Sequence, residues 1–290
     1  MKKNSIAIVC FGITAFSAVP AWSQVLGYGE ITGSYTEGDR GDNEPTDDFS
    51  TIGIAGAVAY AINPQMRLAF DIALNANNGG EDIFDGQEVG NDGEIAVHFL
   101  YDLSAGATIG AYLSGGIAQS ERDEPLEEYP FASFGIEGSM AFNEQWSGYA
   151  QLAAVDQSDD DLGSGGYKEG YALRLGGTYQ FNESTSFYAD VQYGEAKDYE
   201  DADEDGEFAR LALGGETLIN ATDWAVTYEI SRESYVPDEG ADSNDTQVVT
   251  ATLGARYYFG GARPSDLRDA GVIGTPDIVS RASLFTSAAD

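Results

Sequence analysis

Residues 66–75 read MRLAFDIALN, and this stretch decides the fold class of the chain. Every second residue is large and apolar, namely Met66, Leu68, Phe70, Ile72 and Leu74. The residues between them are charged, polar or small, as Arg67, Asp71 and Asn75 illustrate. Successive side chains of a β-strand point to opposite faces, so this alternation predicts a strand with one apolar face and one polar face.

The same alternation fills nearly all of the chain after residue 24 and predicts about twelve strands. We place them near residues 25–36, 51–63, 66–76, 93–103, 106–118, 131–142, 145–156, 167–181, 184–196, 206–219, 222–234 and 245–259. Every second connection is short and carries Asn, Pro or Ser, which are typical of tight turns: 63–65, 104–105, 143–144, 182–183 and 220–221. The other connections are long and hold most of the acidic residues, in clusters at 39–48, 81–88, 121–128, 159–161 and 198–207.

The unequal connections separate two kinds of β-protein. A soluble sandwich or barrel also alternates, but it has no reason to make every other turn short. A membrane barrel has short periplasmic turns and long outer loops, with aromatic girdles at both interfaces. Aromatic residues on the apolar phase do gather beside the short turns: Tyr101, Phe142, Trp146, Tyr179, Phe181, Phe187, Trp224, Tyr257 and Phe259. We therefore expect an all-β fold, a transmembrane antiparallel up-and-down β-barrel of about twelve strands with short periplasmic turns and long acidic outer loops.

The two ends of the chain differ from the barrel in pattern. Lys2 and Lys3, an apolar run over residues 6–19 and the small Ala21 and Ser23 predict a signal peptide at 1–23. The barrel then occupies 24–260. Residues 261–290 form a tail that lies in the periplasm or folds back into the lumen. Cys10, within the leader, is the only cysteine, so we expect neither a disulfide nor a thiolate metal site in the exported chain.

Composition narrows the possible functions. The formal net charge of −35 opposes binding to nucleic acid. Hydrophobic residues make up 42% of the chain, which is too many for a disordered acidic coil. The sequence has no Gly-rich phosphate loop and no Cys or His cluster, so enzyme and nucleotide-binding functions have little support.

The strand pattern over residues 25–259 resembles that of Gram-negative porin-like outer-membrane proteins. The segment 255–259, ARYYF, is similar to the aromatic final strand that the barrel-assembly machinery reads in that family. The family usually ends its chain there, whereas this chain continues from Gly260 to Asp290. The resemblance implies the cell outer membrane, with lipid and lipopolysaccharide as surroundings. It gives no oligomeric state.

The polar phase predicts the side chains that line the lumen: Glu30, Arg67, Asp71, Glu94, His98, Asp102, Glu137, Arg174, Asp190, Arg210, Glu216, Glu229 and Arg256. A twelve-strand barrel leaves an opening of about 10 Å at most, which admits small solutes only. Charges of both signs across such a pore, with acids in excess, favour cations mildly. Small inward residues such as Gly53, Gly110 and Gly116 favour open space. Alternatively, the charged residues pair into a network that closes the lumen.

Two further chemistries have weaker support. His98 is the only histidine and Ser114 is also inward, but no motif fixes their distance, so we predict no catalytic residue. Asp201, Asp203 and Asp205 match the first half of a calcium loop, although its twelfth position is Ala212. We expect no cofactor beyond loosely bound divalent cations, and a solvated acidic surface explains the same residues equally well.

Together these patterns predict a porin-like channel for passive diffusion of small hydrophilic solutes or ions. The alternative is a non-conducting barrel with a structural or surface-interaction role.

Overall fold

The computed structural model describes residues 25–40, 47–79, 88–104, 106–121, 127–157, 169–199, 204–220, 222–237, 246–262 and Gly274. The predicted leader lies outside these ranges, as does the predicted tail apart from Gly261, Ala262 and Gly274. Within the described ranges, no helix is long and apolar enough to cross a membrane.

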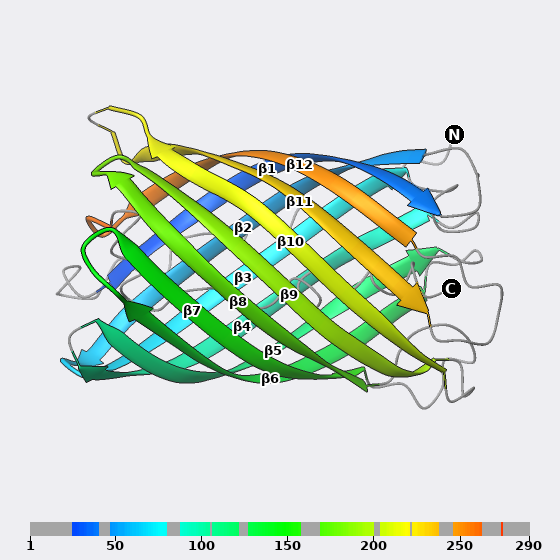
Figure 1. The fold of residues 1–290 in the computed structure, drawn as a ribbon, viewed down its shortest axis with the longest axis horizontal. Coiled ribbons are helices and arrows are strands. Elements are labelled where there is room, and N and C mark those ends of the chain that lie inside the picture. Colours follow the sequence, from blue (N-terminus) through cyan, green and yellow to red (C-terminus); the bar gives the residue numbers. More distant parts are fainter. Residues whose placement is uncertain are drawn as a thin grey trace.

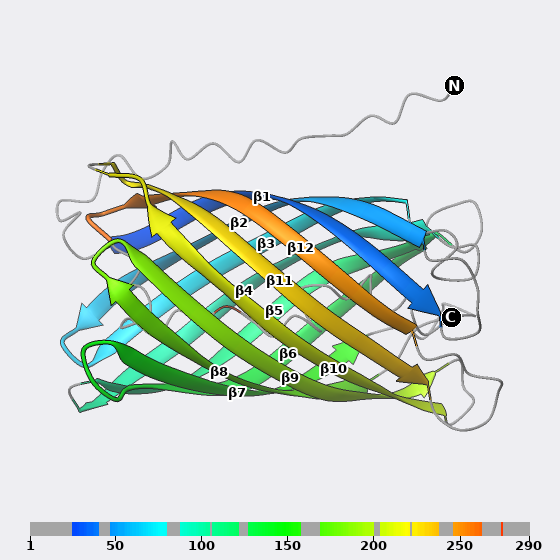
Figure 2. The same cartoon turned by 45° about the horizontal axis from the view of Figure 1, so that its top comes forward.

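Twelve antiparallel strands form one closed barrel, in which each strand pairs with its neighbours in sequence (Figures 1 and 2). The strands are β1 (Val25–Arg40), β2 (Asp47–Asn63), β3 (Met66–Gly79), β4 (Glu88–Ser104), β5 (Ala107–Glu121), β6 (Glu127–Ala141), β7 (Trp146–Gln157), β8 (Glu169–Asn182), β9 (Thr185–Tyr199), β10 (Glu204–Leu218), β11 (Trp224–Pro237) and β12 (Thr246–Phe259). The barrel closes where β1 pairs with β12, from Gly27 opposite Phe259 to Arg40 opposite Thr246. The predicted strand number and up-and-down order are confirmed.

Most strands extend further than the alternation predicts at the end away from the short turns, whereas β8 and β12 begin there one or two residues later than predicted. β4 begins at Glu88 rather than near residue 93, and β6 begins at Glu127 rather than near residue 131. Acidic residues at 39, 47, 48, 88, 121, 127 and 128 therefore lie in strands, although we had placed them in loops. Antiparallel backbones satisfy each other's N–H and C=O groups whatever the side chains are, so pairing continues after the apolar phase has ended.

The short turns owe their shape to side-chain capping. The Asn63 side-chain oxygen accepts hydrogen bonds from the backbone N–H groups of Gln65 and Met66, both at 2.9 Å. Asn143 and Asn182 make the same pair of bonds in the β6–β7 and β8–β9 turns. An Asn side chain that bonds two or three residues ahead imitates a backbone turn, which explains why these connections need so few residues. All five short turns lie at one end of the barrel, on the left of Figure 1.

The outer face of the barrel is apolar and exposed. Ile54, Phe70, Leu113 and Leu253 have between 48% and 63% of their surface exposed. An apolar surface on every strand is far more than a soluble monomer presents to water, and it matches the lipid-facing band of a membrane barrel.

Beside the short turns, outward aromatic side chains pack against each other across strand pairs. The rings of Trp146 and Tyr179 lie 4.6 Å apart and those of Trp224 and Tyr257 lie 5.0 Å apart. These residues belong to the predicted girdle.

Leu113 and Leu103 test whether the outer face lies in hydrocarbon. Leu113 is in the middle of β5 and Leu103 is beside the β4–β5 turn, and their exposed fractions are similar at 53% and 59%. We expect Leu113→Arg to lower the free energy of unfolding by about 2–4 kcal/mol and Leu103→Arg by about 0–1 kcal/mol, because the cost of a charge depends on its depth. Urea unfolding in lipid vesicles, followed by tryptophan fluorescence, measures both. Equal small losses would contradict a membrane-spanning band at this depth.

Candidate functional site

The inner face of the barrel is the candidate site. All thirteen predicted lumen residues lie on the face opposite to the exposed apolar side chains, and all are buried or half-buried. Several of their hydrogen bonds skip a strand: Arg67 on β3 donates to Thr108 on β5, and Arg256 on β12 donates to Glu216 on β10. Bonds of this kind span the concave side of the sheet, which places these groups inside the barrel.

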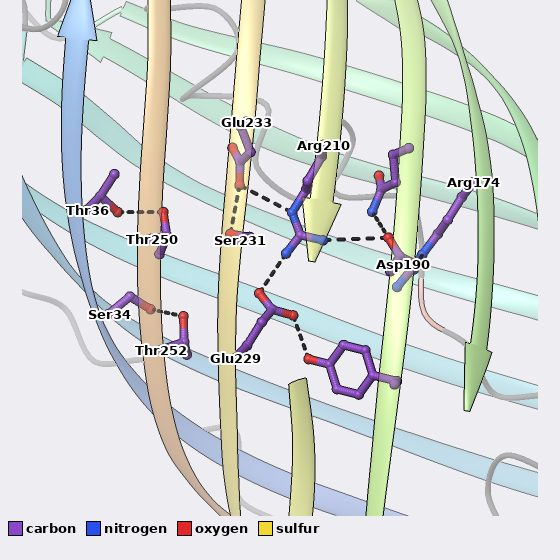
Figure 3. Close-up of polar contacts among 12 residues, drawn as sticks. Ser34, Thr36, Arg174, Asp190, Arg210, Glu229, Ser231, Glu233, Thr250 and Thr252 are labelled. Carbon is purple, nitrogen blue, oxygen red and sulfur yellow. Dashed lines mark hydrogen bonds and ion pairs between the residues drawn. The ribbon is translucent and has the colours of Figure 1, made fainter. Parts of the chain in front are cut away.

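One cluster centres on Arg210 of β10 (Figure 3). Its Nε donates to Glu233 Oε1 at 3.2 Å, and its Nη2 donates to Glu229 Oε1 at 2.7 Å. Its Nη1 lies 3.6 Å from Asp190 Oδ1, while Asp190 Oδ2 accepts a 2.6 Å bond from Arg174 Nε. Ion pairs between side chains therefore connect four adjacent strands, β8 to β11.

A second cluster lies at the seam where the barrel closes. Arg256 Nη2 donates to Glu30 Oε2 at 2.7 Å across the β1–β12 pair, and its Nη1 donates to Glu216 Oε2 at 3.0 Å. The guanidinium also lies 4.2 Å above the ring of Tyr28, a cation–π contact. Further along the seam, Ser34 bonds Thr252 and Thr36 bonds Thr250, both at 2.9 Å (Figure 3).

A separate ion pair lies beside the β4–β5 turn. Arg67 makes a two-pronged contact with Asp102, with both Nη–Oδ distances at 2.7 Å. Such bidentate pairs hold their geometry well. Both side chains keep some exposure, 18% for Arg67 and 24% for Asp102, so ions in the lumen would encounter them.

The remaining predicted acids lie on β3, β4 and β6 and form a wall of the lumen. His98 on β4 lies between two carboxylates, with Nε2 2.5 Å from Asp71 Oδ2 and Nδ1 2.8 Å from Glu137 Oε1. Glu137 Oε2 also accepts a bond from Gln151 Nε2 at 3.1 Å. Glu94 is on the same strand as His98 and is 2% exposed. We call Asp71, Glu94, His98, Glu137 and Gln151 the acidic wall.

Inward tyrosines form a repeated row across three strands. Tyr149 on β7 covers Gly176 on β8, and its hydroxyl donates to Asp190 on β9 at 2.6 Å. Tyr188, Gly214 and Glu229 repeat this arrangement two strands further on, with the hydroxyl at 2.5 Å from the carboxylate. The glycine is required because an added Cβ would collide with the ring.

A third row lacks its acceptor. Tyr112 covers Gly135, but Ala153 stands opposite Gly135 on β7, at the place where the other rows have an acid. The buried Tyr112 hydroxyl lacks a carboxylate acceptor within the described part of the chain, and the polar side chain beside it is that of Ser133.

The small inward residues do not leave the space that we expected from them. A Cβ on Gly110 would lie 2.6 Å from Leu100 Cδ2, and one on Gly116 would lie 2.5 Å from Phe131 Cζ. Neighbouring large side chains thus cover these glycines, which the sequence could not show without the register of the strands.

Sequence reasoning missed several inward groups. Glu233 and Asp92 face inward, and they bring the buried or half-buried lumen acids to ten: Glu30, Asp71, Asp92, Glu94, Asp102, Glu137, Asp190, Glu216, Glu229 and Glu233. The alternation of β11 could have indicated Glu233. Asp92 was missed because the predicted strand began at residue 93, after it. A constant spacing of 41 residues between each row's tyrosine and its acid was a further signal.

The structure does not assemble a catalytic pair from His98 and Ser114. Both ring nitrogens of His98 contact carboxylates, and Ser114 Oγ bonds Ser133 Oγ at 2.5 Å. Asp201 and Asp203 lie outside the described residues, and so does the side chain of Asp205. Among the described residues, no His, Cys, Asp and Glu group is arranged to hold a metal ion.

Comparisons with known proteins support the fold. No family model matches the sequence, and no curated protein does. Among solved structures, the chain is similar to the COG4313 outer membrane channel from Pseudomonas putida F1, with a TM-score of 0.60 and 15% identity over 86% of this chain and 99% of that chain. The translocator domain of autotransporter NalP from Neisseria meningitidis gives 0.49 and 9%, over 81% and 88% of the two chains. The NanC porin gives 0.49 and 10%, over 79% and 98%. At 15% identity, the first likeness shows that this chain has the fold of an outer-membrane barrel.

The incomplete row generates a paired prediction. Tyr149→Phe removes a hydrogen bond to a charged acceptor, so we expect it to lower the free energy of unfolding by about 1.5–3 kcal/mol. Tyr112→Phe removes a hydroxyl that has no charged acceptor, and we expect a loss of at most about 1 kcal/mol. Both rings and their covering contacts stay, which makes each variant the control of the other in urea unfolding. A loss at Tyr112 as large as that at Tyr149 would contradict the absence of a carboxylate acceptor in the third row.

Proposed function

We propose that this chain is a porin-like channel of the cell outer membrane, through which small hydrophilic solutes or ions diffuse passively. The observation that carries this proposal is the contrast between the two faces of the closed barrel: large apolar side chains outside, and clusters of charged and polar side chains inside. The fold shared with an outer membrane channel supports the location and a channel role in general.

A mild preference for cations follows from the charges of the lining. The described lumen has ten buried or half-buried acids against four arginines, Arg67, Arg174, Arg210 and Arg256. Each of these arginines contacts at least one of the acids. The excess acids therefore give the lumen a negative potential, which attracts cations and repels anions.

The ion pairs also support a second candidate, a closed barrel with a structural or surface-interaction role. The side chains of Arg210, Asp190 and Glu233 are at most 3% exposed, as expected of a network that fills the lumen, while that of Glu229 keeps 21%. Weak divalent binding by the acidic segments at 201–205 remains a separate prediction, which calorimetry at millimolar calcium would test.

Arg67 and Asp102 give a sharp test of the channel. We expect single-channel steps in planar bilayers and, in a potassium chloride gradient, a reversal potential biased towards cations. Asp102→Asn should shift that potential towards anions, and Arg67→Gln should shift it further towards cations. Each variant breaks the same ion pair, so the two share any change of shape and differ only in the sign of the charge removed.

Shifts in the same direction would contradict electrostatic selectivity at this pair. Folded, heat-modifiable barrels that pass no current, both as the full chain and as a chain ending at Ala262, would contradict the channel and favour the closed barrel.

A further inference from the structure

A residue from beyond the last strand lies inside the barrel. The backbone oxygen of Gly274 accepts a 2.6 Å hydrogen bond from Gln151 Nε2. Gln151 is on β7, faces inward and is 1% exposed. The same nitrogen donates to Glu137, which in turn contacts His98. The contact therefore joins the chain after β12 to the acidic wall.

The length of the chain permits this contact without strain. Ala262 is packed against Leu218, Ala225 and Tyr258 at the short-turn end of the barrel. Gly274 comes twelve positions later in the sequence, and an extended chain of that length reaches about 40 Å. Gln151 is five residues from the start of β7 at Trp146, or about 17 Å along the strand. The segment can reach the wall by entering the barrel at the short-turn end.

The backbone conformation of Gly274 suits this position. Gly274 has a φ of +76°, a conformation that suits glycine, and nothing lies within 4 Å of the place where a Cβ would be.

We propose that the chain's own C-terminal segment, through Gly274, docks on the acidic wall at Gln151 and narrows the lumen from within. The docking rests on the contact with Gln151 alone, while the narrowing rests also on the proposed channel function. The two parts therefore need separate measurements.

Cross-linking tests the docking without any current. In a Cys10→Ser background, Ala153→Cys and Thr275→Cys are combined in one refolded chain and treated with a short bifunctional thiol reagent, so that Gln151 and Gly274 are both kept. Ala153 is the next inward residue on β7 after Gln151 and is 2% exposed. The control combines Thr275→Cys with Leu152→Cys, because Leu152 is adjacent but faces outward and is 47% exposed. We expect an intramolecular cross-link, seen as a mobility shift of the heated protein, for the first pair only. Equal cross-linking of both pairs, or of neither, would overturn the docking.

Conductance tests the narrowing. We expect a chain ending at Ala262 to give larger single-channel steps than the full chain, and Gln151→Leu in the full chain to raise the step size as well. The second variant keeps the whole sequence, so it remains informative if the shortened chain fails to fold.

The outcomes separate the two proposals. Equal steps from the full chain and both variants would overturn the narrowing while the channel stands. A specific cross-link in a folded barrel that never conducts, shortened or not, would keep the docking and overturn the channel.

Discussion

Backbone hydrogen bonding in a water-free surrounding is the constraint on which the rest of this structure depends. No N–H or C=O group can be left unpaired in hydrocarbon, so a sheet that crosses a membrane has to close. Closure at the β1–β12 seam gives the chain an outside and an inside with different surroundings. Each strand then presents apolar side chains to the lipid and polar or small side chains to the lumen, and this is why the sequence alternates so regularly.

That constraint also explains how much the sequence alone could predict. Residues 66–75 already reveal which side chains face the lipid and which face the lumen, because the period of two is a local property of a strand. The thirteen lumen positions follow from that phase. Their partners do not, because pairing depends on the register between strands that are far apart in sequence. Nothing local indicates that Arg256 would contact Glu30, 226 residues away, or that Phe131 would cover Gly116.

The limits of the strands illustrate the same division. The alternation ends where the lipid ends, so the predicted strands stop near the edge of the apolar band. Backbone pairing has no such limit, and it carries β4 back to Glu88 and β6 back to Glu127. Asp92 was missed for this reason, since its strand was predicted to begin one residue later. A pattern of side chains reports the surroundings of a strand, whereas its length is set by the backbone.

Charge is distributed unevenly around the lumen, and this unevenness connects the candidate functions. Arg174, Arg210 and Arg256 compensate the acids from β8 round to β1, where each guanidinium joins neighbouring strands. Removing one partner of such a buried pair leaves an uncompensated charge, so these residues are strongly tied to stability. The acidic wall, in contrast, is defined by residues of β3, β4, β6 and β7, none of which is an arginine. Carboxylates of this kind attract a diffusing cation, and Gly274 contacts Gln151 beside them. On the proposed channel function, passage of cations and docking of the C-terminal segment would therefore meet at the same part of the lumen.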